Sequence, residues 1–223
     1  PITGLPPANV TAEEVADGVW FLAGQSHHSV MIEFSDHLMI VEAPTESRSL
    51  AVTAKAAELV PDKPIRYLVN THHHFDHSGG IRTAIAQGHT IVTHVANEAF
   101  YRRMAEQPST IVPDTLSENP RPISIEVVED QRTFADDTMT VEVHHIAESP
   151  HSSSMLMVYV PEHKLLIEAD AYNPNPSGPQ NFSPNLLDNI LRLELDVERI
   201  VPIHSGIADF AELEAHVREL RGE

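Results

Sequence analysis

The sequence predicts an α/β protein built as a four-layer αββα sandwich: two mixed β-sheets packed face to face, with helices on the outer faces. Short apolar runs rich in β-branched residues open the chain, and strand-like and helix-like segments then alternate. A Pro-rich stretch over 108–122 interrupts the pattern, and a similar succession of strands and helices follows it. Two sheets that each bury one face against the other and one face beneath helices satisfy both halves.

The first half opens with three strand-like runs separated by polar turns. An amphipathic helix that ends at Pro61 follows, and then a compact apolar strand. In chain order we expect strands at Gly18–Ala23, Ser29–Phe34 and His37–Glu42, a helix at Ser47–Val60, a strand at Ile65–Asn70, a helix at Gly79–Gln87, a strand at Thr90–Thr93 and a helix at Val95–Gln107.

The second half follows the irregular stretch Pro108–Pro122, which we interpret as a connection between halves. In chain order we expect strands at Ile123–Val128, Thr138–His144, Met155–Val160 and Lys164–Glu168, a loop over Asn173–Asn185, a helix at Leu186–Leu195, a strand at Arg199–Ile203 and a helix at Asp209–Arg221. We therefore expect a single domain over 1–223 whose two halves, about 1–110 and 123–223, are similar in architecture.

Composition limits the partners that we expect. The chain has 223 residues, with 33 acidic and 14 basic side chains and a formal charge of -19, so its surface repels phosphate backbones. No apolar run is long enough to cross a bilayer. We therefore expect a small-molecule substrate, and neither nucleic acid nor a membrane as partner; the oligomeric state is open. Because the chain begins at Pro1 rather than Met, we expect a processed product, and its compartment is open.

One short stretch, VNTHHHFDHSGG over Val69–Gly80, concentrates four histidines and one aspartate directly after an apolar strand. In an extended segment, residues two apart share a face, so His72 and His74 can converge on one ion about 2.0–2.1 Å from each ring nitrogen. His73 points to the other face and is expected to pack or to support the site. The alternative is a His-rich surface loop without a metal.

Asp76 and His77 are out of phase with the two preceding ligands. The chain must turn near Asp76, and we expect Gly79 and Gly80 to permit that turn through their conformational freedom. A turn there would direct Asp76 and His77 at a second, adjacent ion. The spacing therefore suits two neighbouring metals better than one.

Further ligands must be imidazoles or carboxylates, because the chain has no cysteine. Three candidates lie just beyond apolar runs, as His72 does: His151, Asp170 and His204. Imidazoles and carboxylates at buried strand ends are costly unless paired or bound to metal, which favours one shared site. His144 and His145 are rivals of His151, but they close a strand, where consecutive side chains point to opposite faces.

The motif H-x-H-x-D-H, read here as His72-His73-His74-Phe75-Asp76-His77, resembles the signature of the metallo-β-lactamase superfamily. The resemblance covers essentially the whole chain, including the order of the three later candidates. It implies that His72, His74 and His151 hold one divalent ion, that Asp76, His77 and His204 hold the other, and that Asp170 bridges them. Zinc is the ion that the resemblance implies, and iron and manganese also occur in the family.

Three positions depart from the family's usual pattern. Ala169 precedes the bridging aspartate where glycine is usual, His151 lies between Pro150 and Ser152, and Ser205 separates His204 from the following glycine. These departures bear on subfamily placement more than on the metal ligands.

The resemblance implies a metal-dependent hydrolase in which two ions activate a water molecule and Asp76 is catalytic, passing a proton to the leaving group. A small ester, lactone or amide is the substrate left by elimination: β-lactamases with a Cys ligand are excluded, and other dizinc β-lactamases generally lack a bridging aspartate. The alternatives are a β-lactam hydrolase, an iron-dependent oxidoreductase, and a non-hydrolytic metal-binding module of the same fold.

Three residues are candidates for contact with the substrate beside the metals. His27 and His28 lie in a predicted hairpin turn that can overhang the ions, and Tyr172 follows Asp170 by two residues. Each has a plain alternative: a solvated turn for the histidines, and core packing for the tyrosine. Four other histidines are expected on the surface, in turns or helices: His37, His89, His163 and His216.

Overall fold

The computed structural model describes residues 8–24, 27–174 and 182–223. The first sheet has the order β1-β2-β3-β4-β5-β6-β7, so its strands lie in the order in which they occur along the chain. The strands are β1 (Thr11–Ala16), β2 (Val19–Ala23), β3 (Ser29–Glu33), β4 (Leu38–Val41), β5 (Ile65–Val69), β6 (Thr90–His94) and β7 (Ser124–Val128). Pairing is antiparallel from β1 to β4 and parallel from β4 to β7, which makes the sheet mixed.

The second sheet has the order β13-β12-β11-β10-β9-β8. Its strands are β8 (Gln131–Ala135), β9 (Thr140–His145), β10 (Leu156–Val160), β11 (Leu165–Glu168), β12 (Arg199–Pro202) and β13 (Ala208–Asp209). Only the β11–β12 pair is parallel among the described strands of this sheet. The parallel pair matters for the site, because both of its strands end at the same edge.

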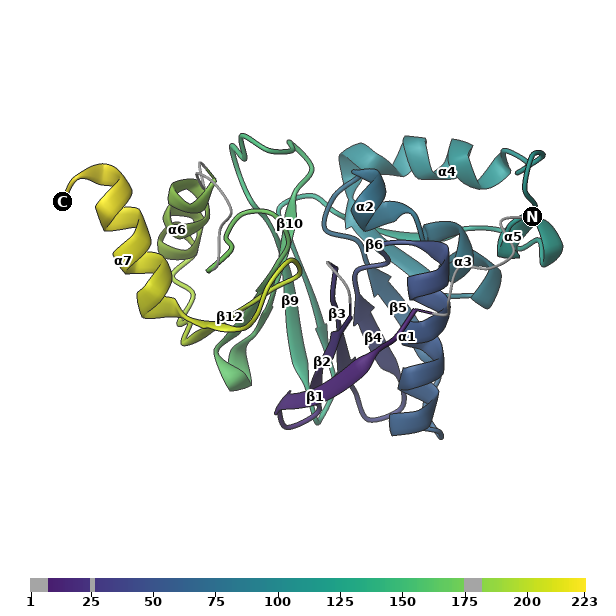
Figure 1. The fold of residues 1–223 in the computed structure, drawn as a ribbon, viewed down its shortest axis with the longest axis horizontal. Helices are drawn as coiled ribbons and strands as arrows, with labels where there is room; N and C mark the ends of the chain where they lie inside the picture. The colour runs from purple at the N-terminus through teal and green to yellow at the C-terminus, as the bar shows by residue number, and fades with distance from the viewer. Residues whose placement is uncertain (1–7, 25–26, 175–181) are drawn as a thin grey trace.

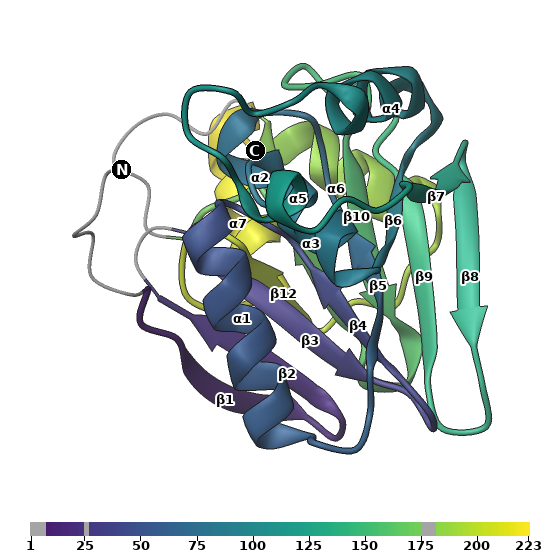
Figure 2. The same cartoon turned by 90° about the vertical axis from the view of Figure 1, so that its right-hand side faces the viewer.

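Helices cover the outer face of each sheet (Figures 1 and 2). The helices are α1 (Glu46–Leu59), α2 (Phe75–Ser78), α3 (Ile81–Gln87), α4 (Glu98–Glu106), α5 (Thr115–Glu118), α6 (Ser183–Arg192) and α7 (Phe210–Arg221), with 3-10 turns η1 (Val95–Asn97) and η2 (Pro161–His163). Helices α1 and α3 pack on the first sheet, and α6 and α7 pack on the second. The predicted αββα sandwich is confirmed.

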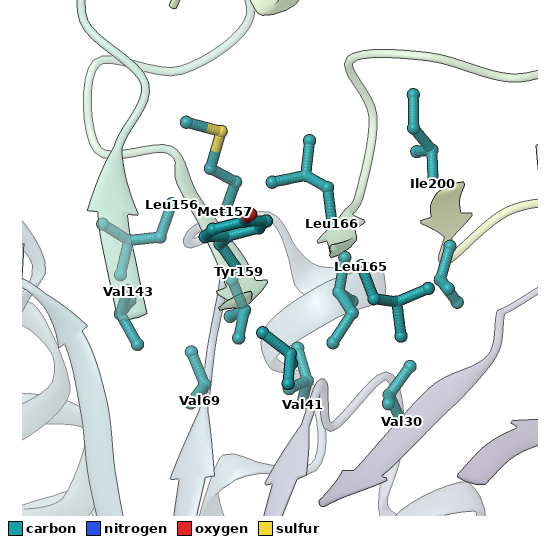
Figure 3. Close-up of a cluster of buried hydrophobic side chains, with 14 of the residues drawn as sticks. Val30, Val41, Val69, Val143, Leu156, Met157, Tyr159, Leu165, Leu166 and Ile200 are labelled. Atoms are coloured by element: carbon teal, nitrogen blue, oxygen red, sulfur yellow. The ribbon is translucent and has the colours of Figure 1, made fainter. Parts of the chain in front are cut away.

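The core between the sheets is built from side chains that alternate along the strands. Val30, Val41 and Val69 of the first sheet face Val143 and Leu165 of the second, and all five are fully buried (Figure 3). Each such side chain contributes about 1.5–3 kcal/mol by leaving water. A second core lies between the first sheet and helices α1 and α3. Because both faces of the first sheet are covered, its central strands have continuous apolar sequences.

Two strands, β1 and β8, lack the apolar pattern that predicts a strand, because they lie at sheet edges. Strand β1 is mostly exposed and has no apolar alternation, and β8 buries only Phe134. Their pairing with β2 and β9 determines their conformation, which the local sequence does not indicate.

Two of the histidines expected on the surface, His37 and His89, are instead buried, 6% and 8% exposed.

The chain changes sheets between β7 and β8, at residues 128–131. The predicted strand at Ile123–Val128 therefore pairs with β6 in the first sheet rather than opening the second. A single domain with two similar halves, about 1–110 and 123–223, stays a prediction.

Backbone hydrogen bonds tie together the loops that leave one end of the sandwich. The N–H of Leu156, where β10 begins, donates to the carbonyl of Thr71 beyond β5 at 2.8 Å. The N–H of Ile203, beyond β12, donates to the carbonyl of Glu168 at 2.9 Å, and the N–H of His28 donates to the carbonyl of Ile203 at 2.8 Å. Loops from both sheets thus meet at this end.

Candidate metal centre

Two groups of His and Asp side chains meet where these loops converge. In each group the donor atoms lie within 4.8 Å of one another. The first group is His72, His74, His151 and Asp170, and the second is His27, Asp76, His77 and His204. The structure thus brings together all seven residues proposed as ligands from the sequence, and it adds His27.

In the first group, three imidazoles surround one oxygen of Asp170. His72 Nε2 lies 3.0 Å from His74 Nδ1 and 3.3 Å from His151 Nε2. Asp170 Oδ2 lies 2.8 Å from His151 Nε2 and 3.3 Å from His72 Nε2. Ligands about 2.0–2.1 Å from one zinc ion are roughly 3.0–3.6 Å from their neighbours, so the spacing fits a shared ion.

In the second group, His77 and His204 face the other oxygen of the same aspartate. Asp170 Oδ1 lies 2.6 Å from His204 Nε2 and 3.2 Å from His77 Nε2. The two Nε2 atoms are 3.1 Å apart, and Asp76 Oδ2 lies 3.7 Å from His77 Nε2. These distances also suit ligands of one ion.

The motif itself folds as an extended segment that runs into a short helix. His74 is the N-cap of α2 with extended backbone, and the helix then carries Asp76 and His77 toward the second group. The predicted turn is therefore present, but the glycines serve it differently than expected. Gly79 and Gly80 have φ of -62° and -97°, which any residue adopts. What excludes a side chain is space, because a Cβ on Gly80 would lie 1.9 Å from Ser49 Oγ.

Glu42 is a residue of the candidate centre that was not predicted from the sequence. Its carboxylate is fully enclosed and accepts hydrogen bonds from His77 Nδ1 at 2.5 Å and from the N–H of Thr71 at 2.7 Å. Glu42 has a left-handed backbone (φ 76°), which is costly for a residue with a side chain and is common at functional sites. The sequence offered one signal for Glu42, which is an acidic residue directly after the buried run LMIV.

Hydrogen bonds on the far side of two rings hold their orientation. The bond to Glu42 leaves the Nε2 of His77 facing the second group. The Thr71 hydroxyl lies 3.1 Å from His72 Nδ1, which likewise leaves His72 Nε2 for the first group. Such outer partners orient histidines that bind metal and raise their basicity.

The electrostatics of the centre also favour a cation. Burial and neighbouring imidazoles lower the pKa of His72 and His74, which favours the neutral rings that bind metals. Burial opposes the charged form of His77, but Glu42 and Asp170 outweigh it and raise its pKa to about 10. Burial likewise opposes ionisation of Asp170, yet hydrogen bonds from the four surrounding imidazoles hold its pKa below the usual range. The field at the centre therefore favours positive charge.

Glu168 occupies the corresponding place in the second sheet, at the end of β11. Its Oε2 accepts the N–H groups of Ala171 at 2.9 Å and Tyr172 at 3.2 Å, which fixes the turn that carries Asp170. Burial raises the pKa of Glu168 well above its usual value. In each sheet, a buried glutamate at the end of a central strand thus holds a segment that carries a proposed ligand: Glu42 after β4, and Glu168 at the end of β11.

The family model that describes the metallo-beta-lactamase superfamily matches residues 23–204. The chain belongs to the metallo-beta-lactamase superfamily. The matched region runs from the end of β2 to His204 and so includes both groups of side chains. No curated protein matches the chain.

Solved structures show the same fold as this superfamily member. A metallo-beta-lactamase from Pontibacter korlensis has a TM-score of 0.74 at 16% identity, covering 96% of this chain and 100% of that one. The DIM-1 metallo-beta-lactamase has a TM-score of 0.71 at 16% identity, with coverage of 94% and 96%. FIM-1 from Pseudomonas aeruginosa, in its mono-zinc form, has a TM-score of 0.69 at 18% identity, with 97% of each chain covered.

Among the described residues, no helix has the length and apolar character needed to span a membrane.

Three other histidines near the centre of this superfamily member lie outside both groups. His73 Nδ1 is 3.4 Å from Ser154 Oγ. His144 is buried with its Nε2 2.9 Å from a Glu142 oxygen. His145 donates through Nε2 to the carbonyl of Ser153 at 3.0 Å.

The candidates for substrate contact are placed differently from one another. His27 lies in the second group. His28 points inward, where its Nδ1 accepts the N–H of Gly24 at 3.2 Å and its ring packs edge-on against Phe21. Tyr172 is 3% exposed, and its ring lies 6.0 Å from that of His216 on α7. The described contacts of His28 and Tyr172 are structural, and a role for either in substrate binding stays a prediction.

Replacing Glu42 by glutamine will weaken metal binding at the second group. The amide no longer provides a charged acceptor for His77 Nδ1–H, and such outer partners are worth roughly 10–100-fold in metal affinity. Competition with a chromophoric chelator for Zn²⁺ measures the change. Glu198→Gln is the control, because Glu198 is an exposed glutamate that pairs with Lys164 away from the imidazoles. Wild-type affinity in Glu42→Gln would show that Glu42 has no such role.

Proposed function

We propose that the chain is a hydrolase that uses two divalent metal ions, most simply Zn²⁺. His72, His74 and His151 would hold one ion, and Asp76, His77 and His204 would hold the other. Asp170 would bridge the two. The residues fit such ions, because the spacing of their ring nitrogens and carboxylate oxygens matches that of ligands around one ion.

The observation that carries this proposal is the position of the Asp170 carboxylate. One oxygen faces His72 and His151, and the other faces His77 and His204. A carboxylate surrounded in this way by four imidazoles is expected between two cations rather than beside one. Ions held by its two oxygens would supply a Lewis-acid centre for one substrate.

Two bound ions supply a water molecule made acidic enough to act as a nucleophile near neutral pH. The chain's own part is orientation and proton transfer. Asp76 is 54% exposed at the open side of the second group, and its hydrogen bond with His27 helps to keep its pKa low against burial. As an ionised carboxylate it can accept a proton from the attacking water and pass it to the leaving group.

Two aromatic residues lie next to proposed ligands and support a substrate with an apolar part. Phe75, directly before Asp76, is 77% exposed. The ring of Phe182 lies 4.9 Å from that of His151. Exposed aromatic surface beside a polar centre is typical of small-molecule binding sites. With a formal charge of -19, these features support a small ester, lactone or amide rather than a polyphosphate.

A β-lactam is the second candidate substrate, because the solved structures compared above, which share this fold, are metallo-beta-lactamases. The bridging position of Asp170 counts against it, since dizinc β-lactamases without a Cys ligand generally lack such an aspartate. An iron-dependent oxidoreductase is a third candidate, and metal analysis of the purified protein separates it from a zinc hydrolase.

Purified, metal-replete protein will contain close to two ions per chain by elemental analysis. It will hydrolyse lactones or simple esters faster than thioesters, phosphodiesters or β-lactams in a parallel screen, and chelation will abolish the activity. A reproducible content of one ion that His204→Ala leaves unchanged would contradict the dinuclear centre. Preference for a β-lactam would replace the substrate class but leave the centre intact.

A further inference from the structure

His27 belongs to the second group and lies in the connection between β2 and β3. Its Nε2 is 3.3 Å from Asp76 Oδ2, and its ring packs edge-on to that of His204 with centroids 4.3 Å apart. The donor atoms of His27, Asp76, His77 and His204 lie within 4.8 Å of one another. Ligands on opposite sides of one ion are roughly 4.0–4.4 Å apart, so a small side-chain movement places all four on one ion.

The segments around His27 are fixed to the rest of the fold. Before it, the buried guanidinium of Arg48 donates to the carbonyls of Leu22 and Ala23. After it, the N–H of His28 donates to the carbonyl of Ile203, which directly precedes His204 in the chain. A backbone hydrogen bond thus joins the segment of His27 to that of a proposed ligand. The fold, and not chance contact of a surface turn, places the His27 ring at the centre.

We propose that His27 is a fifth protein ligand of the second ion, through Nε2. This inference rests on the proposed dinuclear centre. The second site would then offer three imidazoles and two carboxylate oxygens, whereas the first offers three imidazoles and one. Because it has one donor more, the second site fills first and holds its ion more tightly.

Two other roles for His27 predict different results. If it only hydrogen-bonds Asp76, it acts as an outer partner, and glutamine, which keeps an N–H donor, should largely replace it. If it only contacts the substrate, metal affinity should not depend on it. If it is a ligand, neither alanine nor glutamine replaces the lost nitrogen, and the loss exceeds the roughly 10–100-fold typical of an outer partner.

The test is a chelator competition with Zn²⁺ on demetallated wild type, His27→Ala and His27→Gln. Ligand-field spectra of the same proteins loaded with one and two equivalents of Co²⁺ give a second readout, because band intensity depends on coordination number. We expect both variants to lose more than about 100-fold in affinity for the tighter ion only. We also expect the spectrum at one equivalent to change. Circular dichroism checks that the fold is kept.

His28→Ala is the matched control, since this histidine is adjacent but packs on Phe21 and belongs to neither group. It should keep both affinities. Full rescue by glutamine, or unchanged affinity with a raised KM for substrate, would overturn the assignment of His27 and leave the dinuclear centre standing. A wild type that binds no second ion would overturn the proposed centre and this inference together.

Discussion

Replacement of Asp170 by alanine will release both metal ions and lower activity by more than about 10³-fold, the upper range for one lost electrostatic contact. One oxygen of the carboxylate faces imidazoles of the first group, and the other faces imidazoles of the second. Without it, each site loses a donor, and the negative charge that compensates two cations disappears. Elemental analysis and a hydrolysis assay on the same preparation measure both effects.

The fold of the Asp170→Ala variant should persist, because Asp170 lies at a strand end while the core between the sheets is apolar. Far-ultraviolet circular dichroism will show this. Asp188→Ala, which removes an exposed aspartate paired with Arg221, is the control and should keep two ions and full activity. Full metal retention in Asp170→Ala would show that Asp170 is structural only.

The second large effect is expected at His151. Its Nε2 is 2.8 Å from Asp170 Oδ2 and 3.3 Å from His72 Nε2, so its loss leaves the first site without one of three imidazoles. We expect His151→Ala to retain close to one ion, at the second site, and to lose activity by about 10²–10³-fold. Titration of demetallated protein with Zn²⁺ gives the stoichiometry directly.

Alanine variants of His144 and His145 are the controls for His151. Both histidines close β9, and their ring nitrogens contact Glu142 and the carbonyl of Ser153 rather than the centre. Each variant should keep two ions with at most a modest loss of activity. Loss of one ion in either of them, with two ions retained in His151→Ala, would reverse the assignment.

The sequence by itself determined the class of fold and the residues gathered at the site. The alternating run of β9 and the apolar runs of β2, β4 and β11 have few alternatives to strands that bury a face. Histidine at buried strand ends is costly without a partner, so the positions of His72, His151 and His204 beyond apolar runs favoured one shared site. The resemblance to the superfamily's motif implied which of them share an ion. These features depend on the chemistry of short segments, which can be read directly from the sequence.

Only the tertiary structure decided which side chains support the centre and which strands complete the sheets. Glu42 is 35 residues from His77, and nothing in the sequence around either one indicates their hydrogen bond. His27 reaches Asp76 across 49 residues, and β1 and β8 are strands because of their partners. These features depend on contacts between distant segments, which chain folding brings together and which no local pattern encodes.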